Sequence, residues 1–318
     1  MWVQWKFGKA HVFPFPSLCY TFFCTRSCEG VPSMGLTIEE KNLLRKIEEW
    51  KNREWANAAN DFNQTYDQWI DEAFSLLPDP IRKKWSDRLD EWFLLLQLAI
   101  QERRAFTDRL NKIIDEARMM DPNVETVSDM KKLPISVGNF LADRQIATHR
   151  MYTLFQGGLT GSGKNLFLFA DIPVLYFLNM RAVLLIAASY GFDPKSPFET
   201  VLALRVFLAS TLPKRFQSRL WEELLEEVRE GNFPYFTDDP EPFGGEKWLN
   251  PLISQLWKMA AIRLFRKDRT EQIPVFSLAI GMGWNYAFSK KVTEFARKFY
   301  QYRRLMEKIG GDPAAHLS

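Results

Sequence analysis

Cysteine and histidine are both scarce in this chain of 318 residues, which has three of each. All three cysteines, Cys19, Cys24 and Cys28, fall in the first tenth of the sequence. Their spacing lacks the fourth ligand or the paired histidines of a structural zinc site. The histidines after this stretch are His149 and His316, and a lone histidine is more typical of a core or surface position than of a catalytic base. We therefore expect no metal, no cofactor and no catalytic residue.

Neither charge of one sign nor a long apolar run dominates the sequence. The 42 basic and 39 acidic residues leave a net charge of +3, which is too balanced to indicate a nucleic-acid partner. The 14% of aromatic residues excludes a disordered chain, and the 16 glycines exclude a collagen-like one. The longest uncharged piece of the apolar patches, Ile273–Phe288, has 16 residues, fewer than the roughly 20 of a membrane span.

We interpret these apolar patches, which are Asn165–Phe192, Val201–Leu212 and Ile273–Phe288, as buried core helices. For Asn165–Phe192 a re-entrant membrane hairpin is the alternative. In that case Asp171 would have to pair with Arg181, because an unpaired charge inside a bilayer is expensive.

The first 33 residues differ from the rest of the chain. They hold every cysteine, and Pro14 and Pro16 interrupt the apolar run that a secretory signal peptide would need. The sequence after them reads as a helix start, because Thr37 and Glu40 form the capping-box pattern S/T-x-x-E. We interpret residues 1–33 as a poorly structured N-terminal extension or an over-called start.

Helical periodicity continues from there to the end. Phe216, Leu220, Leu224 and Val228 repeat every four residues, and Gly231 follows as the closing residue of that helix. The sequence predicts an all-α fold, a compact bundle of about ten helices with a Gly-rich apolar helical hairpin. The expected domain is 36–309, with N-terminal helices at 36–121, an apolar helical core at 137–309 and a flexible tail at 310–318.

A glycine-rich stretch comes close to a nucleotide-binding loop. Gly158, Gly163 and Lys164 match the Walker A pattern G-x-x-x-x-G-K-[ST], but Asn165 replaces the hydroxyl residue that holds Mg²⁺. The only apolar run that ends in Asp, 167–171, follows immediately and leaves no room for the intervening helix. We favour a structural glycine turn between two helices, with a P-loop-like nucleotide-binding enzyme as the alternative.

The predicted last helix, Ser289–Ile309, concentrates positive charge, with seven basic residues against Glu294 and Glu307 and a net charge of +5. Such a helix can bind an anionic membrane surface, and a solvated helix face is an equally good interpretation. The seven residues are Lys290, Lys291, Arg297, Lys298, Arg303, Arg304 and Lys308.

Small residues precede this basic helix. Ser277 with Gly281 and Ala279 with Gly283 form two small-xxx-small pairs, which permit close helix contact. Asn285 can bond across such a contact.

Ordered patches along the chain carry a family resemblance. They are LLPDPIRKKW (76–85), GGLTGSG (157–163), ADIP (170–173), LNMRAVLLIAASYGFD (178–193), IPVFSLAIGMGWNYAF (273–288) and a closing RRL (303–305). In this order they resemble the EcsC family over about Leu36 to Ile309.

The resemblance implies a mainly helical, membrane-associated bacterial protein with no established catalytic activity. The family's namesake is encoded beside an ABC transporter linked to protein secretion, which implies an accessory role there. We expect a cytoplasmic protein, peripheral at the inner face of the cell membrane, whose partner is an anionic membrane surface or a membrane protein. The residues expected to serve structure and packing are Gly158, Gly161, Gly163, Asp171, Pro173, Arg181, Tyr190, Gly191, Gly281, Gly283 and Asn285.

Overall fold

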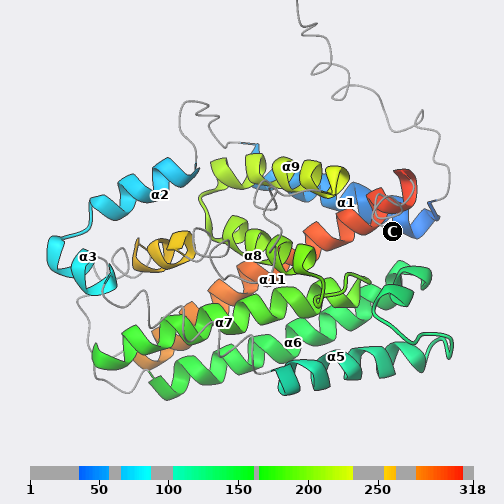
Figure 1. Cartoon of the computed structure of the whole chain (residues 1–318), viewed down its shortest axis with the longest axis horizontal. Coiled ribbons are helices and arrows are strands. Elements are labelled where there is room, and N and C mark those ends of the chain that lie inside the picture. Colours follow the sequence, from blue (N-terminus) through cyan, green and yellow to red (C-terminus); the bar gives the residue numbers. More distant parts are fainter. Residues whose placement is uncertain are drawn as a thin grey trace, which may run out of the picture. The chain divides into compact units, whose positions relative to one another are not determined.

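A computed structural model describes residues 36–56, 66–86, 103–160, 165–231, 254–262 and 277–310. Most of these residues are helical, no strand occurs among them, and the predicted all-α fold is confirmed (Figure 1). The helices are α1 (Ile38–Trp55), α2 (Tyr66–Ser75), α3 (Asp79–Ser86), α5 (Arg103–Arg118), the short 3-10 helix η1 (Ser128–Lys132), α6 (Ile135–Thr160), α7 (Asn165–Ser189), α8 (Pro197–Thr211), α9 (Lys214–Glu230) and α11 (Ser277–Gly310). Residues 254–262 are also helical. The expected extension at 1–33 and the tail beyond Gly310 lie outside the described residues.

Local sequence signals set where two of these helices begin and end. At the start of α1, the Thr37 N–H donates to Glu40 Oε2 at 2.7 Å and the Glu40 N–H donates to Thr37 Oγ1 at 3.3 Å. This is the predicted capping box, which satisfies N–H groups that have no partner within the helix. At the end of α9, Gly231 adopts the left-handed conformation with φ of 65°, as the sequence predicted.

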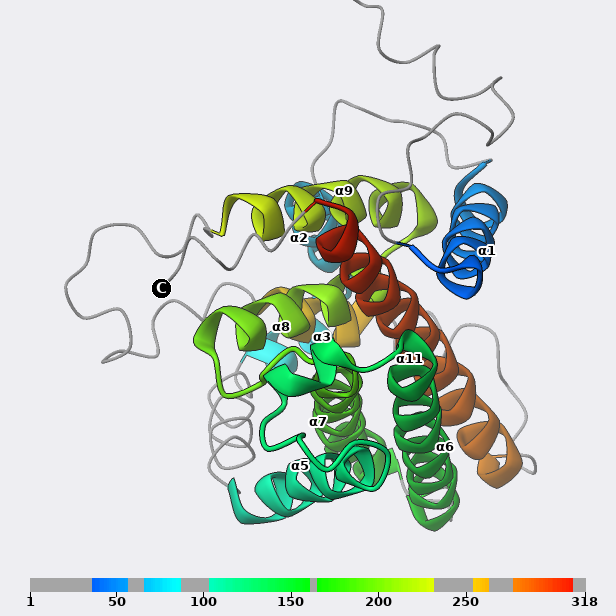
Figure 2. The ribbon, with the colours of Figure 1, turned by 90° about the vertical axis from the view of Figure 1, so that its right-hand side faces the viewer.

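α6, α7 and α11 pack extensively against one another (Figures 1 and 2). α6 and α7 are consecutive and antiparallel, and together they form the apolar helical hairpin. The connection between them falls between Thr160 and Asn165.

The alternative of a re-entrant hairpin within Asn165–Phe192 is wrong. α7 is a single helix from Asn165 to Ser189, because the apolar run contains no break strong enough to reverse the chain. Asp171 and Arg181 lie on this one helix, separated by about 15 Å along its axis, so they cannot form the pair that the hairpin required.

α11 is also a single helix, which corrects the prediction of two separate segments, Ile273–Phe288 and Ser289–Ile309. It runs for 34 residues from Ser277 to Gly310 without a proline. An isolated glycine in a helix costs about 1 kcal/mol relative to alanine, which surrounding packing readily offsets. The apolar beginning and the basic end of α11 therefore share one axis.

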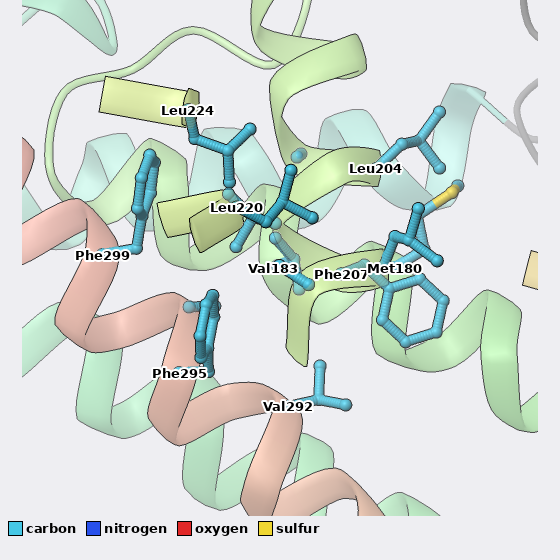
Figure 3. Close-up of a cluster of buried hydrophobic side chains, with 14 of the residues drawn as sticks. Met180, Val183, Leu204, Phe207, Leu220, Leu224, Val292, Phe295 and Phe299 are labelled. Carbon is cyan, nitrogen blue, oxygen red and sulfur yellow. The ribbon is translucent and has the colours of Figure 1, made fainter. Parts of the chain in front are cut away.

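α8 lies in the core, as predicted for the apolar patch that contains it. Every residue from Val201 to Thr211 is buried, and Arg205 among them forms an ion pair with Glu227 of α9. Figure 3 shows the apolar layer to which α7, α8, α9 and α11 contribute Met180, Val183, Leu204, Phe207, Leu220, Leu224, Val292, Phe295 and Phe299.

Two glycines of the family motifs have opposite surroundings. Gly191 follows α7 with φ of 90°, and a Cβ there would lie 2.5 Å from Lys131 Cγ and 2.9 Å from the Lys131 backbone nitrogen. At Gly283 of α11 a Cβ would meet no atom within 4 Å among the described residues. The small-xxx-small contact at Gly283 has no partner among the described residues, and it stays a prediction.

We predict that Gly191→Ala lowers the free energy of unfolding by about 2 kcal/mol, because alanine disfavours a positive φ and its methyl group would overlap the Lys131 backbone. Gly283→Ala is the matched control, and it should raise stability by up to about 1 kcal/mol through helix propensity alone. Urea unfolding followed by circular dichroism measures both changes. A similar effect in the two variants would contradict this assignment.

Candidate functional site

Arg303, predicted to face a membrane, lies inside the bundle and is only 5% exposed. Its guanidinium donates two hydrogen bonds to the Glu199 carboxylate of α8, at 2.7 and 2.8 Å, and a third to Glu307 at 3.2 Å. The guanidinium carbon lies 3.8 Å from the ring centre of Phe192, and Lys131 Nζ approaches the same ring at 4.6 Å while donating to Glu307 at 2.9 Å. We call these five residues the Arg303 network.

The prediction that Arg303 belongs to a membrane surface is therefore wrong. Helical spacing places a residue on a face, but it does not indicate which face the rest of the chain will cover. Burying a guanidinium requires counter-ions and hydrogen-bond acceptors, and Glu199 and Glu307 supply both.

Two more cations of α11 bind carboxylates on other helices. Arg297 donates to Asp143 of α6 at 2.9 Å, and Lys308 Nζ lies 2.8 Å from the Glu40 carboxylate of α1. The net charge of +5 counted along the isolated helix therefore overestimates the positive charge that α11 presents to its surroundings.

The remaining cations of α11 have mixed environments. Lys290 is exposed, and Lys291 Nζ donates to the Leu212 carbonyl at 3.4 Å. Lys298 is half-buried, and this burial lowers its pKa. Arg304 lines a cleft between the start of α1 and the end of α11. A role for these residues at a lipid surface stays a prediction.

We predict that Arg303→Met lowers the free energy of unfolding by about 3–5 kcal/mol, because Glu199 would stay buried without its counter-ion. The control is Lys290→Met, an exposed position on the same helix, which should change it by less than about 0.5 kcal/mol. Chemical unfolding measures both. A loss in Arg303→Met as small as that of the control would show that the network contributes nothing to stability.

Tyr190, which was expected to serve packing, contacts Asn139, a residue that sequence reasoning missed. The Tyr190 hydroxyl donates to Asn139 Oδ1 of α6 at 2.9 Å, and Gln301 of α11 donates to the same oxygen at 2.7 Å. A Cβ on Gly138 would lie 3.0 Å from the Ser189 carbonyl oxygen, so α6 and the end of α7 are close here. These contacts hold the beginning of α6 against the ends of the other two helices.

The ends of α6, α7 and α11 that carry the family's apolar motifs lie together in the described bundle (Figures 1 and 2). We call residues 151–160, 165–174 and 277–286 the apolar end. Asp171 is the only charged residue in these three segments. No described helix has the combination of length and apolarity needed to cross a bilayer.

Large apolar side chains are exposed where the apolar end begins. Met151 is 52% exposed, Val174 44% and Tyr286 39%, and Tyr152 beside Met151 is exposed as well. Met151, Val174 and Tyr286 each lie nine residues from the described end of their helix, or about 14 Å along its axis, so they occupy corresponding positions on three packed helices.

Polar contacts mark the boundary above these positions. Arg150 donates to Thr293 Oγ1 of α11 at 3.0 Å. His149 Nε2 lies 3.1 Å from Asn179 Oδ1 of α7, and the Asn179 amide group donates to the Leu175 carbonyl at 2.7 Å. Because that amide group donates, its oxygen accepts, and we assign the imidazole proton to Nε2. Burial lowers the pKa of His149 to about 4, so the imidazole is neutral at pH 7.

The lowered pKa of His149 has a consequence for stability. An unfolded histidine has a pKa near 6.5, so the unfolded state binds the proton first as pH falls. The stabilisation of the folded state by neutral His149 is present above about pH 6.5 and is lost as pH falls toward 4. Between pH 7 and pH 4 the free energy of unfolding should fall by about 3 kcal/mol more in the native protein than in His149→Gln. The glutamine amide does not titrate in this range and can still donate to Asn179, so this variant is the control. Urea unfolding at several pH values measures the difference, and parallel profiles would disprove it.

Several predicted residues lie at the edges of the described part of the chain or outside it. Gly158 is in the last turns of α6, and Gly161, Gly163 and Lys164 lie outside the described residues. The side-chain surroundings of three further residues, Asp171, Pro173 and Gly281, are not described either. Of the rest, Asn285 is buried, and the Arg181 guanidinium lies 5.9 Å from the ring centre of Phe106.

The structure does not support the nucleotide-binding alternative. A P-loop joins a strand to a helix, whereas the segment before this glycine-rich stretch is the helix α6, which extends to Thr160. Among the described residues there is also no group of three or more His, Cys, Asp or Glu side chains able to hold a metal ion.

These features define an all-α protein organised around a glycine-rich hairpin and a long C-terminal helix. The chain belongs to the EcsC protein family, whose model matches residues 41–305. The match extends from α1 to the basic end of α11, and it confirms the resemblance inferred from the ordered motifs.

Two curated proteins of Bacillus subtilis (strain 168) are similar to this chain. The uncharacterized protein YdbA is 23% identical over 276 residues, which cover 84% of this chain and 93% of YdbA. Protein EcsC is 26% identical over 211 residues, which cover 64% of this chain and 79% of EcsC. No solved structure matches.

Proposed function

We propose that this chain is a non-enzymatic protein that binds peripherally to a lipid bilayer through the apolar end of α6, α7 and α11. The observation that carries the proposal is the exposure of Met151, Val174 and Tyr286 at corresponding positions of three packed helices. Soluble proteins rarely expose a contiguous group of large apolar side chains unless that surface meets a partner.

The chemistry of this end favours a bilayer over a protein partner. Its three segments are almost free of charge, which suits contact with lipid chains. Tyr152 and Tyr286 combine an apolar ring with a polar tip, as side chains at a membrane interface do. The polar contacts of Arg150 and His149 begin directly above, at a depth that headgroups and water would occupy.

Electrostatic attraction has a smaller part in this proposal than the charge of α11 suggested. Lys290 is exposed one turn after Tyr286 and can meet an anionic headgroup, a contact that contributes about 1 kcal/mol. Arg297, Arg303 and Lys308 are already paired within the protein. Apolar contact therefore supplies most of the affinity.

We place this contact at the inner face of the cell membrane. An accessory role beside a membrane transporter, which the family resemblance implied, is compatible with binding at that surface. It stays part of the proposal.

The test is flotation with vesicles that contain anionic lipid, at low salt. The native chain should float with the vesicles, and Met151→Glu/Tyr286→Glu should lower the bound fraction about tenfold, because two exposed apolar contacts are replaced by charges. The matched control is Phe140→Glu, which changes an equally exposed side chain near the other end of α6 and should bind as the native chain does.

The same experiment separates the apolar from the electrostatic contribution. Lys290→Gln should weaken flotation less than the double substitution does. Failure of the native chain to float at low salt would end the proposal, and equal losses in Phe140→Glu and the double variant would show that the apolar end is not the contact surface.

A further inference from the structure

A cavity of about 520 Å³ lies between α5, α6 and α7, away from the Arg303 network. Its volume falls in the range that small-molecule sites occupy in proteins. Leu178, Ala182 and Leu185 recur at helical spacing along one face of α7 and line it with an apolar wall.

Positive charge gathers on the other walls of this cavity. Arg109 and Lys112 line it from α5 and Arg181 lines it from α7, whereas Asp108 is the one carboxylate of the lining. These four side chains leave an excess of two positive charges around the cavity. Because the cations come from two helices, an anion held between them would contact both.

The contacts of His149 and Arg109 leave the excess of positive charge in the lining unchanged. His149 is neutral at pH 7 and already donates its Nε2–H to Asn179. Arg109 donates one of its five N–H groups to the Tyr152 hydroxyl at 2.9 Å and stacks over that ring at 5.3 Å. Tyr152 is exposed, so this contact holds a guanidinium where the cavity reaches the protein surface.

We propose that this cavity binds an amphiphilic anion, a molecule with one phosphate or carboxylate head group and an apolar chain. The head group contacts Arg109, Lys112 and Arg181, and the chain lies against Leu178 and Ala182. This site borders the bilayer contact proposed above at Tyr152 but differs from it, because it holds a single molecule and uses residues of α5.

The test is calorimetric titration of the native chain with decyl phosphate below its micelle concentration. We expect saturable binding of one molecule per chain. Decanol lacks the charge and inorganic phosphate lacks the chain, so each should bind at least about tenfold more weakly. Equal affinity for inorganic phosphate would show that the cavity binds a free phosphate ion and would overturn the proposal. Equal affinity for decanol would overturn it as well.

Two variants examine the head-group contact. Lys112 is exposed, and Lys112→Gln should leave the fold intact while raising the dissociation constant of decyl phosphate about fivefold. The matched control is Lys195→Gln, an exposed lysine that does not line the cavity, and it should bind as the native chain does. Unchanged affinity in Lys112→Gln would overturn the proposal.

Two further variants examine where the chain of the ligand binds. Ala182→Met places a larger side chain in the cavity and should weaken the binding of decyl phosphate about tenfold. If that variant does not fold, Lys112→Gln still tests the proposal. Met151→Glu/Tyr286→Glu alters the proposed bilayer contact but not the cavity, so it should bind decyl phosphate normally. Loss of binding in that variant would assign decyl phosphate to the apolar end and overturn the proposal.

Discussion

The pairing of Arg303 with Glu199 is the contact on which the position of α11 depends. A guanidinium buried at this depth is tolerated only if carboxylates meet it with good geometry, and here two oxygens of one carboxylate meet two of its nitrogens at 2.7 and 2.8 Å. A buried ion pair adds little net stability compared with apolar packing, but it is directional. It holds α11 at one register against α8, and Lys131 extends the same network toward the start of α6.

That register divides α11 into two functional halves. From Arg297 onward, carboxylates of α1, α6 and α8 take up most of the positive charge. Before Asn285 the helix is apolar. It reaches the end of the bundle where α6 ends and α7 begins (Figure 1). The basic half thus holds the helix in place, and the apolar half belongs to the bilayer contact that we propose.

Much of the fold could be predicted because its signals are local. The capping box at Thr37, the closing Gly231 and the apolar stretch of α8 each depend on neighbouring residues, and each was confirmed. The division of α11 and the hairpin within 165–192 were wrong, since apolar composition and isolated glycines do not indicate where a helix stops. Asn139 and Glu199 gave no signal of their contacts, which join residues 162 and 104 positions apart.

The sequence by itself determined the helical class, several helix ends and membership of the EcsC family, since these follow from short-range pattern and motif order. Only the tertiary structure decided which cations are buried and which side chains of the hairpin are exposed. It also assembled the cavity beside His149 from three helices. The physical reason is that burial depends on what the rest of the chain packs against a face. A helix pattern identifies the face but not its neighbour.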